Sequence, residues 1–136
     1  MESGKVQMSP RAGANPLYAI DLEVIEQLEE SMRPDVGFVD QLARIFLREL
    51  DRRMVELEKG MREGNGEEIA MAAHAIKGSC SHFGAHRMMA LCASVERLAL
   101  GGEVVEVARP IADLIEEAGR VRAALEAWLN RLRYPG

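Results

Sequence analysis

The chain has 136 residues and a mass of 15.0 kDa, enough for one domain with a single core and too short for a kinase domain joined to a substrate domain. Hydrophobic residues make up 48% and aromatic residues only 4%, so we expect a core of Ala, Leu, Ile, Val and Met, which is typical of helices. The net charge of −5 offers no positive surface to a phosphate backbone, so no nucleic-acid binding is expected.

The N-terminal region divides into a tail and the start of a helical domain. Residues 1–17 are rich in Ser, Gly and Pro without an apolar period, which predicts a flexible tail, and residues 18–134 are predicted to form one helical domain. Asp21 is the predicted N-cap of a first helix, because apolar residues follow it at helical spacing: Leu22, Ile25, Leu28 and Met32.

A second, longer helix follows the break at Arg33-Pro34-Asp35, and Asp35 is its predicted cap. Gly64-Asn65-Gly66 is the predicted stop. The charged stretch 48–63 within this helix is predicted to be a solvated face with ion pairs between successive turns. The apolar stripe of the helix consists of Phe38, Leu42, Ile45, Phe46, Met54, Leu57 and Met61.

Three further helices are predicted over residues 67–83, 85–100 and 103–132, separated by Gly84 and Gly101-Gly102. In the last of them, Pro110 should either kink the helix or mark its true start. Because no strand pattern occurs, we expect an all-α fold: an antiparallel four-helix bundle with an additional short N-terminal helix. The residues of the 85–100 helix that should face inward are Met88, Leu91, Cys92, Val95 and Leu98.

The cysteines and the N-terminal sequence indicate the cellular compartment in which the protein is expected. Cys80 and Cys92 lack CxxC spacing and are expected to be small buried hydrophobic side chains rather than a disulfide or metal pair. Neither an apolar signal core nor a run of about 18 apolar residues occurs, so we expect a cytoplasmic protein without a membrane partner.

The segment from Ala73 to Ala85, with the sequence AHAIKGSCSHFGA, contains the candidate functional residues. With about 100° per residue, a helical wheel places Lys77, Gly78 and Ser81 near His74, on the face opposite the apolar residues. His74 is therefore predicted to be exposed. The buried face of this helix should consist of Ile69, Ala73, Ile76, Cys80 and Phe83.

An exposed imidazole can act as a nucleophile near neutral pH, and Lys77 one turn later can place a positive charge beside an incoming anion. Gly78 costs helix stability by about 1 kcal/mol relative to alanine. This cost favours either a flat site where another protein approaches or a packing notch for a neighbouring helix.

The string AHAIKGSCSHFGA, followed by LCASVERLALGG, resembles the histidine-containing phosphotransfer (HPt) domain, whose pattern is His-x-x-Lys-Gly-Ser and then Gly-Ala. The resemblance covers about residues 20–132. It implies that His74 is the phosphorylated histidine, that Lys77 stabilises the phosphoryl group and that Gly78 admits the partner's active site. Glu96, 22 positions after His74, would orient the imidazole.

Five more residues are candidates for binding. Ser79 matches the HPt motif but is turned partly away on the wheel, and Ser81 is a weaker candidate for a hydrogen bond to the histidine. Met71 and Ala75, together with Ala70, would supply an apolar docking patch beside His74.

The resemblance implies a phosphoryl carrier rather than an enzyme with its own ATP-dependent kinase activity. Its expected partners are response-regulator receiver domains and a hybrid sensor histidine kinase. No cofactor is expected, because magnesium would come from the receiver domain. A monomer is the expected state.

Two other functions stay open. The chain could be a helical adaptor that binds a receiver or kinase surface without being phosphorylated. A metal-binding bundle is a weaker alternative, suggested by His82 and His86 at i, i+4 spacing. Gly84 between those two histidines should end the helix, and Met71, three residues before His74, cannot serve as a metal-binding carboxylate, so no metal site is predicted.

Overall fold

The computed structural model describes residues 19–33, 35, 37–103 and 105–133, with the side chains of residues 132 and 133 left out. The predicted tail, residues 1–17, lies outside the described residues. Within them the chain is helical and contains no strand, as the apolar periodicity predicts. The helices are α1 (Leu22–Ser31), α2 (Phe38–Glu63), α3 (Gly66–Cys80), the short 3-10 helix η2 (Ser81–Phe83), α4 (His86–Leu100) and α5 (Ala108–Arg133).

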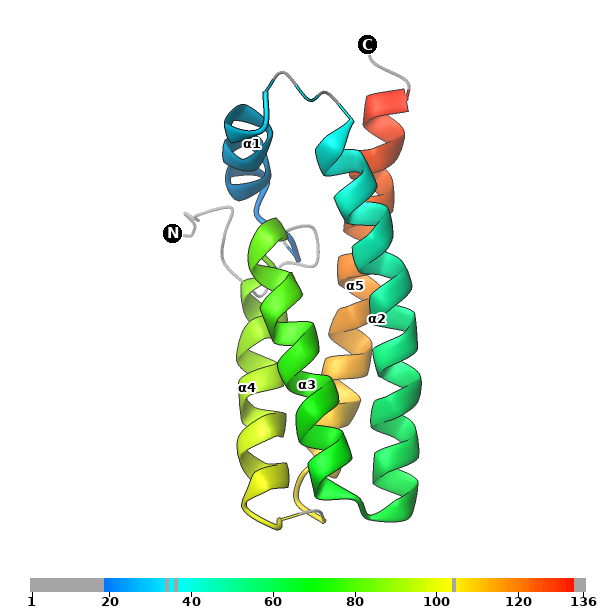
Figure 1. Cartoon of the computed structure of the whole chain (residues 1–136). Coiled ribbons are helices and arrows are strands. Elements are labelled where there is room, and N and C mark those ends of the chain that lie inside the picture. The colour runs from blue at the N-terminus through cyan, green and yellow to red at the C-terminus, as the bar shows by residue number, and fades with distance from the viewer. Residues whose placement is uncertain (1–18, 34, 36, 104, 134–136) are drawn as a thin grey trace, which may run out of the picture.

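The four long helices form an antiparallel bundle, and α1 lies over the end of the shorter α3–α4 pair (Figure 1). Around the bundle, α3 packs against α2 and α4, and α5 packs against the same two helices. Helix α5 is therefore diagonally opposite α3. The predicted four-helix bundle with a short additional N-terminal helix is confirmed.

Helix bounds follow local signals, with three differences from the sequence prediction. Asp21 caps α1 by accepting a hydrogen bond from the Glu23 amide at 3.0 Å, as predicted. Helix α2 is capped by Gly37 rather than Asp35, and Gly37 has no side chain with which to accept a hydrogen bond. Helix α3 stops at Cys80 and continues as η2, whereas α5 begins at Ala108, so that Pro110 lies in its first turn, where a missing amide hydrogen costs little.

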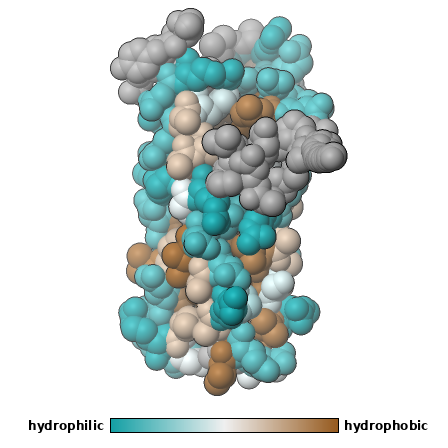
Figure 2. Space-filling model, turned by 180° about the vertical axis from the view of Figure 1, so that it is seen from behind, coloured by the Kyte–Doolittle hydropathy of each residue, from teal (hydrophilic) through white to brown (hydrophobic). Residues whose placement is uncertain are grey.

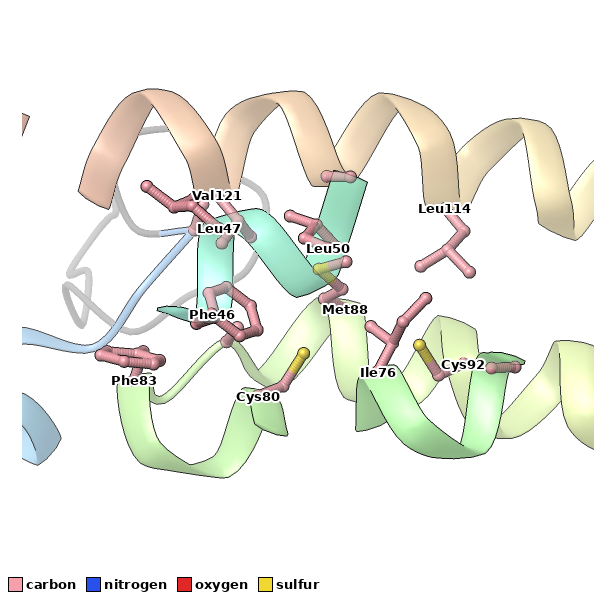
Figure 3. Packing of buried hydrophobic residues seen from close by; sticks show 14 of the residues in the cluster. Phe46, Leu47, Leu50, Ile76, Cys80, Phe83, Met88, Cys92, Leu114 and Val121 are labelled. Carbon is pink, nitrogen blue, oxygen red and sulfur yellow. The ribbon is translucent and has the colours of Figure 1, made fainter. Parts of the chain in front are cut away.

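The core lies between the four long helices (Figure 3). Phe46 of α2 and Phe83 of η2 stack with their ring centroids 5.1 Å apart at a tilt of 43°, which closes the core at the α1 end. Met88, Cys92 and Val95 of α4 are fully buried as predicted, whereas Leu91 and Leu98 are only half-buried and pack against the edge of the core.

Both cysteines are buried and unpaired, as predicted. Burial raises the pKa of the Cys92 thiol to about 12, and burial also raises the pKa of Cys80. The two side chains are therefore uncharged thiols at neutral pH and act as apolar core residues.

Ion pairs between helices surround this core. The carboxylate of Glu117 on α5 is almost completely buried, and its Oε1 atom lies 3.3 Å from Arg87 Nε of α4 and 3.0 Å from Arg120 Nη1. Arg122 of α5 pairs with Asp51 of α2. The predicted pairs on the charged face of α2 are also present, for example Arg52 with Glu49 at 2.9 Å.

Two residues, Asp21 and Gly84, allow α1 to pack against the bundle. The Asp21 amide donates a hydrogen bond to the Phe83 carbonyl at 2.9 Å, and Asp21 Oδ2 lies 3.3 Å from His86 Nε2 of α4. Gly84 adopts a φ of +62°, and a Cβ atom at this position would overlap the Cβ atom of Asp21. The Gly84 turn after η2 therefore allows close contact between α1 and the α3–α4 connection.

Candidate functional site

His74 lies in the middle of α3 and points away from the core. Asn65 caps the start of the helix, and its side chain accepts a hydrogen bond from the Glu68 amide at 3.0 Å. The predicted buried face is confirmed, since Ile69, Ala73, Ile76, Cys80 and Phe83 are all buried. The His74 side chain is 70% exposed, as the wheel predicts.

The structure brings three charged or ionisable side chains together at this position. Glu96 lies on α4, which runs antiparallel to α3, and its Oε2 atom is 3.0 Å from His74 Nδ1. Its other oxygen, Oε1, accepts a hydrogen bond from Lys77 Nζ at 3.3 Å. The carboxylate, whose side chain is 22% exposed, therefore bridges the imidazole and the ammonium group.

This contact has a consequence for the imidazole. An ionised carboxylate can only accept hydrogen bonds, so Nδ1 of His74 must carry the proton when the two groups bond. The proton-free nitrogen of the neutral ring is then Nε2. Because only Nδ1 faces Glu96, the lone pair of Nε2 is available to an approaching electrophile.

The surface next to His74 is open at Gly78. A Cβ atom built there would meet no other atom within 4 Å, so no neighbouring helix occupies the position. The packing-notch interpretation is therefore wrong. A second protein can approach the helix backbone at this point, one residue after Lys77 and one turn after His74.

The two serines bond to their own helix rather than to the imidazole. Ser79 Oγ donates to the Ala75 carbonyl at 3.4 Å, and Ser81 Oγ donates to the Gly78 carbonyl at 3.2 Å. Ser79 lies in the last turn of α3, and Ser81 is the first residue of η2.

The apolar patch beside His74 is smaller than predicted. Met71 is 68% exposed and Ala75 is half-buried, so both can contribute to a docking surface. Ala70 is buried, contrary to the sequence expectation. Helices α2 and α4 both pack against α3, and the methyl group of an alanine is too short to extend past a neighbouring helix.

The other two histidines lie away from this site. His86 contacts Asp21, and the ring of His82 lies against Phe83 with the centroids 6.3 Å apart. In the part of the chain that the structure describes, no three His, Cys, Asp or Glu side chains are grouped so that they could hold a metal ion. No described helix is long and apolar enough to span a membrane.

The sequence did not predict the ion pair between Lys77 and Glu96. Each residue was expected to act separately, Lys77 on the phosphoryl group and Glu96 on the imidazole. The two residues are 19 positions apart with the η2 turn between them, so their contact depends on how α3 and α4 align. The sequence feature that could have indicated this pair is the opposite charge of two residues on helices predicted to be neighbours.

Comparisons with known proteins point to one family of domains. A family model described as the Hpt domain matches residues 41–133. The sensor protein TorS of Escherichia coli is 36% identical over 76 residues, which make up 56% of this chain and 7% of TorS. The pseudo histidine-containing phosphotransfer protein 1 of rice is 28% identical over 116 residues, 82% of this chain and 60% of that protein. The chain thus spans less than two thirds of either relative.

Two crystal structures have the same fold. The histidine-containing phosphotransfer protein HptB of Pseudomonas aeruginosa has a TM-score of 0.76 and 24% identity, covering 83% of this chain and 96% of that one. The histidine-containing phosphotransfer protein ZmHP2 of maize has a TM-score of 0.72 and 19% identity, covering 92% and 99%. At these identities the likeness shows a shared fold.

Proposed function

Because this chain belongs to the Hpt domain family, we propose that it is a phosphorelay intermediate, which accepts a phosphoryl group on His74 from an aspartate of one receiver domain and passes it to another. The observation that carries this proposal is the exposed imidazole with Nδ1 bound by Glu96. That contact leaves Nε2 as the nucleophile and holds the ring in one orientation.

The transfer consists of two displacements at phosphorus. The Nε2 lone pair attacks the phosphorus of an aspartyl phosphate, a P–N bond forms, and the P–O bond to the aspartate breaks with its electron pair remaining on the carboxylate. In the second step the aspartate of another receiver attacks the phosphohistidine. The P–N bond then breaks, and its electron pair returns to Nε2.

Lys77 and Gly78 would assist through charge and access. The Lys77 ammonium group is close enough to bind Glu96, and a short rotation of its flexible side chain would bring it to a phosphoryl group on the imidazole. The open surface at Gly78 would let the partner's active-site loops reach His74. Met71 and Ala75 would add apolar contact area beside the transferred group.

We further propose that the partners are receiver domains and a hybrid sensor histidine kinase, and that the receiver supplies the magnesium ion. The similarity to a sensor protein supports this choice of partners. The chain would act as a carrier without making its own phosphohistidine from ATP, since its sequence contains no glycine-rich nucleotide loop.

Incubation with a receiver domain that carries a labelled aspartyl phosphate tests the proposal. We expect an acid-labile, base-stable label on the wild-type chain and on His82→Gln, a matched control at another exposed histidine. The His74→Gln variant should stay unlabelled while its helical circular dichroism remains unchanged. A label that persists in His74→Gln, or one that never appears on the wild type, would contradict the carrier function.

The adaptor alternative makes a different prediction in the same experiment. An adaptor would bind the receiver with equal affinity as wild type and as His74→Gln, and neither form would become labelled. Binding measured by titration calorimetry next to the labelling experiment therefore separates the two functions.

A further inference from the structure

Helix α5 has an open groove on the side of the molecule that faces away from α3. The groove has a volume of about 660 Å³ and lies between α5 and the start of α1, where Ile20 and Leu22 form one wall. Leu22 is 50% exposed there. Figure 2 shows the bundle from behind, where hydrophobic residues (brown) are interspersed with hydrophilic ones (teal). The floor of the groove includes the small residues Gly119, Ala123 and Ala127.

Trp128 also lines the groove. Its side chain is only 4% exposed, yet its indole N–H has no hydrogen-bond acceptor in the described part of the chain. A buried donor without a partner is unfavourable, so such a group is rare in a protein interior.

The groove carries a negative charge near one end and a positive charge near the other. Glu116 and Arg131 both line it, and on a helical wheel they share an arc of about 120° with the small residues. Glu116 is well exposed and contacts Arg120 at 3.6 Å, whereas Arg131 has no ion-pair partner within the described residues. Glu116 and Arg131 are 15 positions apart in the sequence, which places them about 22 Å apart along α5.

An antiparallel copy of the same helix fits this arrangement. If two α5 helices cross with Ala123 of one copy opposite Ala124 of the other, each Glu116 faces the Arg131 of the other copy. The same register places Gly119 opposite the other copy's Trp128, and a Cβ at Gly119 would meet no atom within 4 Å in the single chain. Small residues at the crossing allow two helix backbones to approach closely.

We infer that this groove is a homodimer interface, in which α5 packs antiparallel against α5 of a second copy and two Glu116–Arg131 ion pairs close its ends. The interface would leave both phosphotransfer sites free, because α3 is diagonally opposite α5 in the bundle. Such a dimer would present two His74 imidazoles on its outer faces. A receiver domain is a poor fit for the groove, since it must reach His74 on the other side.

The dimer should be weak and reversible. One pair of crossing helices with the adjacent α1 wall covers less than a standard interface, so we expect a dissociation constant on the order of 10 µM. Sedimentation equilibrium of the full chain between about 1 and 200 µM should show the mass rise from 15.0 kDa toward twice that value. A constant mass of one chain over this range overturns the inference.

Single substitutions in the groove locate the interface. Ala123→Glu introduces a charge at the crossing and should keep the chain monomeric, with unchanged circular dichroism because Ala123 is exposed in the single chain. Val55→Glu places the same charge at an exposed apolar residue of α2 and should leave the dimer intact. Equal dissociation in both variants, or in neither, contradicts the assignment to α5.

Charge reversal tests the antiparallel register. Glu116→Arg and Arg131→Glu should each weaken dimerisation about tenfold or more, because each creates two like-charge contacts. The double variant carrying both changes should recover wild-type affinity, and so should an equimolar mixture of the two single variants. A double variant as weak as the singles would disprove the register. These readouts do not involve phosphotransfer, so the inference and the proposed function can fail separately.

Discussion

Glu96 Oε2 lies 3.0 Å from His74 Nδ1, although the two residues are 22 positions apart and belong to different helices. The same carboxylate binds Lys77 on the helix of the histidine. One residue of α4 thus sets the hydrogen-bonding state of the imidazole and the resting position of the lysine.

Replacing Glu96 tests whether the carboxylate orients the imidazole. In Glu96→Ala, the ring loses a charge-assisted hydrogen bond, and we expect transfer to His74 to slow by about 10- to 100-fold. Glu96→Gln should slow it less, because the amide oxygen can still accept from Nδ1. Rapid-quench kinetics give the rates, and ¹⁵N chemical shifts of His74 report its tautomer. Equal rates in all three proteins would show that Glu96 has no orienting function.

Lys77→Ala tests the charge beside the phosphoryl group. We expect phosphoryl transfer to slow by about 100-fold, since a preorganised positive charge is lost where negative charge must be compensated. Helicity should be unchanged, because the side chain is partly exposed and fills no core space. Arg97→Ala removes an exposed basic residue of α4 and is the matched control, expected to transfer normally. A comparable loss in Arg97→Ala would indicate a general electrostatic effect instead.

Gly78 is predicted to matter for docking and not for folding. Gly78→Ala should raise the free energy of unfolding by about 1 kcal/mol, because alanine favours the helix and the added Cβ meets no other atom. Gly78→Leu should fold as well as the wild type, yet bind and phosphorylate poorly because its side chain blocks the partner. Urea denaturation and receiver titration measure the two effects. Wild-type transfer by Gly78→Leu would exclude a close approach at this position.

Gly84 and Gly64 form a matched pair for the attachment of α1. Both have positive φ, at +62° and +64°, so alanine at either costs about 1–2 kcal/mol in backbone strain. At Gly84 the new Cβ would also overlap Asp21, whereas at Gly64 it meets nothing within 4 Å. Urea denaturation should therefore show a larger loss for Gly84→Ala, and hydrogen exchange should show earlier opening of α1. Equal losses would mean that the Asp21 contact contributes little.

Because the carboxylate of Glu117 is buried, removing its two arginine partners should destabilise the chain more than neutralising the carboxylate itself. Removing Arg87 and Arg120 together leaves a buried charge without compensation, so the double alanine variant should lose about 3–5 kcal/mol of unfolding free energy. Glu117→Gln should cost less, because both arginines are partly exposed and can be hydrated. Chemical denaturation of the two variants measures the difference. A more stable double variant than Glu117→Gln would contradict this explanation.

The sequence by itself predicted the helices, most of their bounds and the exposure of His74. These properties depend on apolar spacing at 3.6 residues per turn and on capping or helix-breaking residues, which act within a few positions of the chain. The resemblance to the HPt pattern added the residue types expected around the histidine. The prediction failed at Ala70, which is buried between packed helices, and at the start of α2, where Gly37 rather than Asp35 is the cap.

Only the tertiary structure decided the contacts between helices. The bridge from Glu96 to His74 and Lys77 depends on the alignment of α3 with α4, which the η2 turn and core packing determine. The groove along α5 depends on where the start of α1 lies against the bundle, because Ile20 and Leu22 form one of its walls. Contacts of this kind join residues that are distant in the chain, and their geometry follows from how whole helices pack, which a local pattern does not encode.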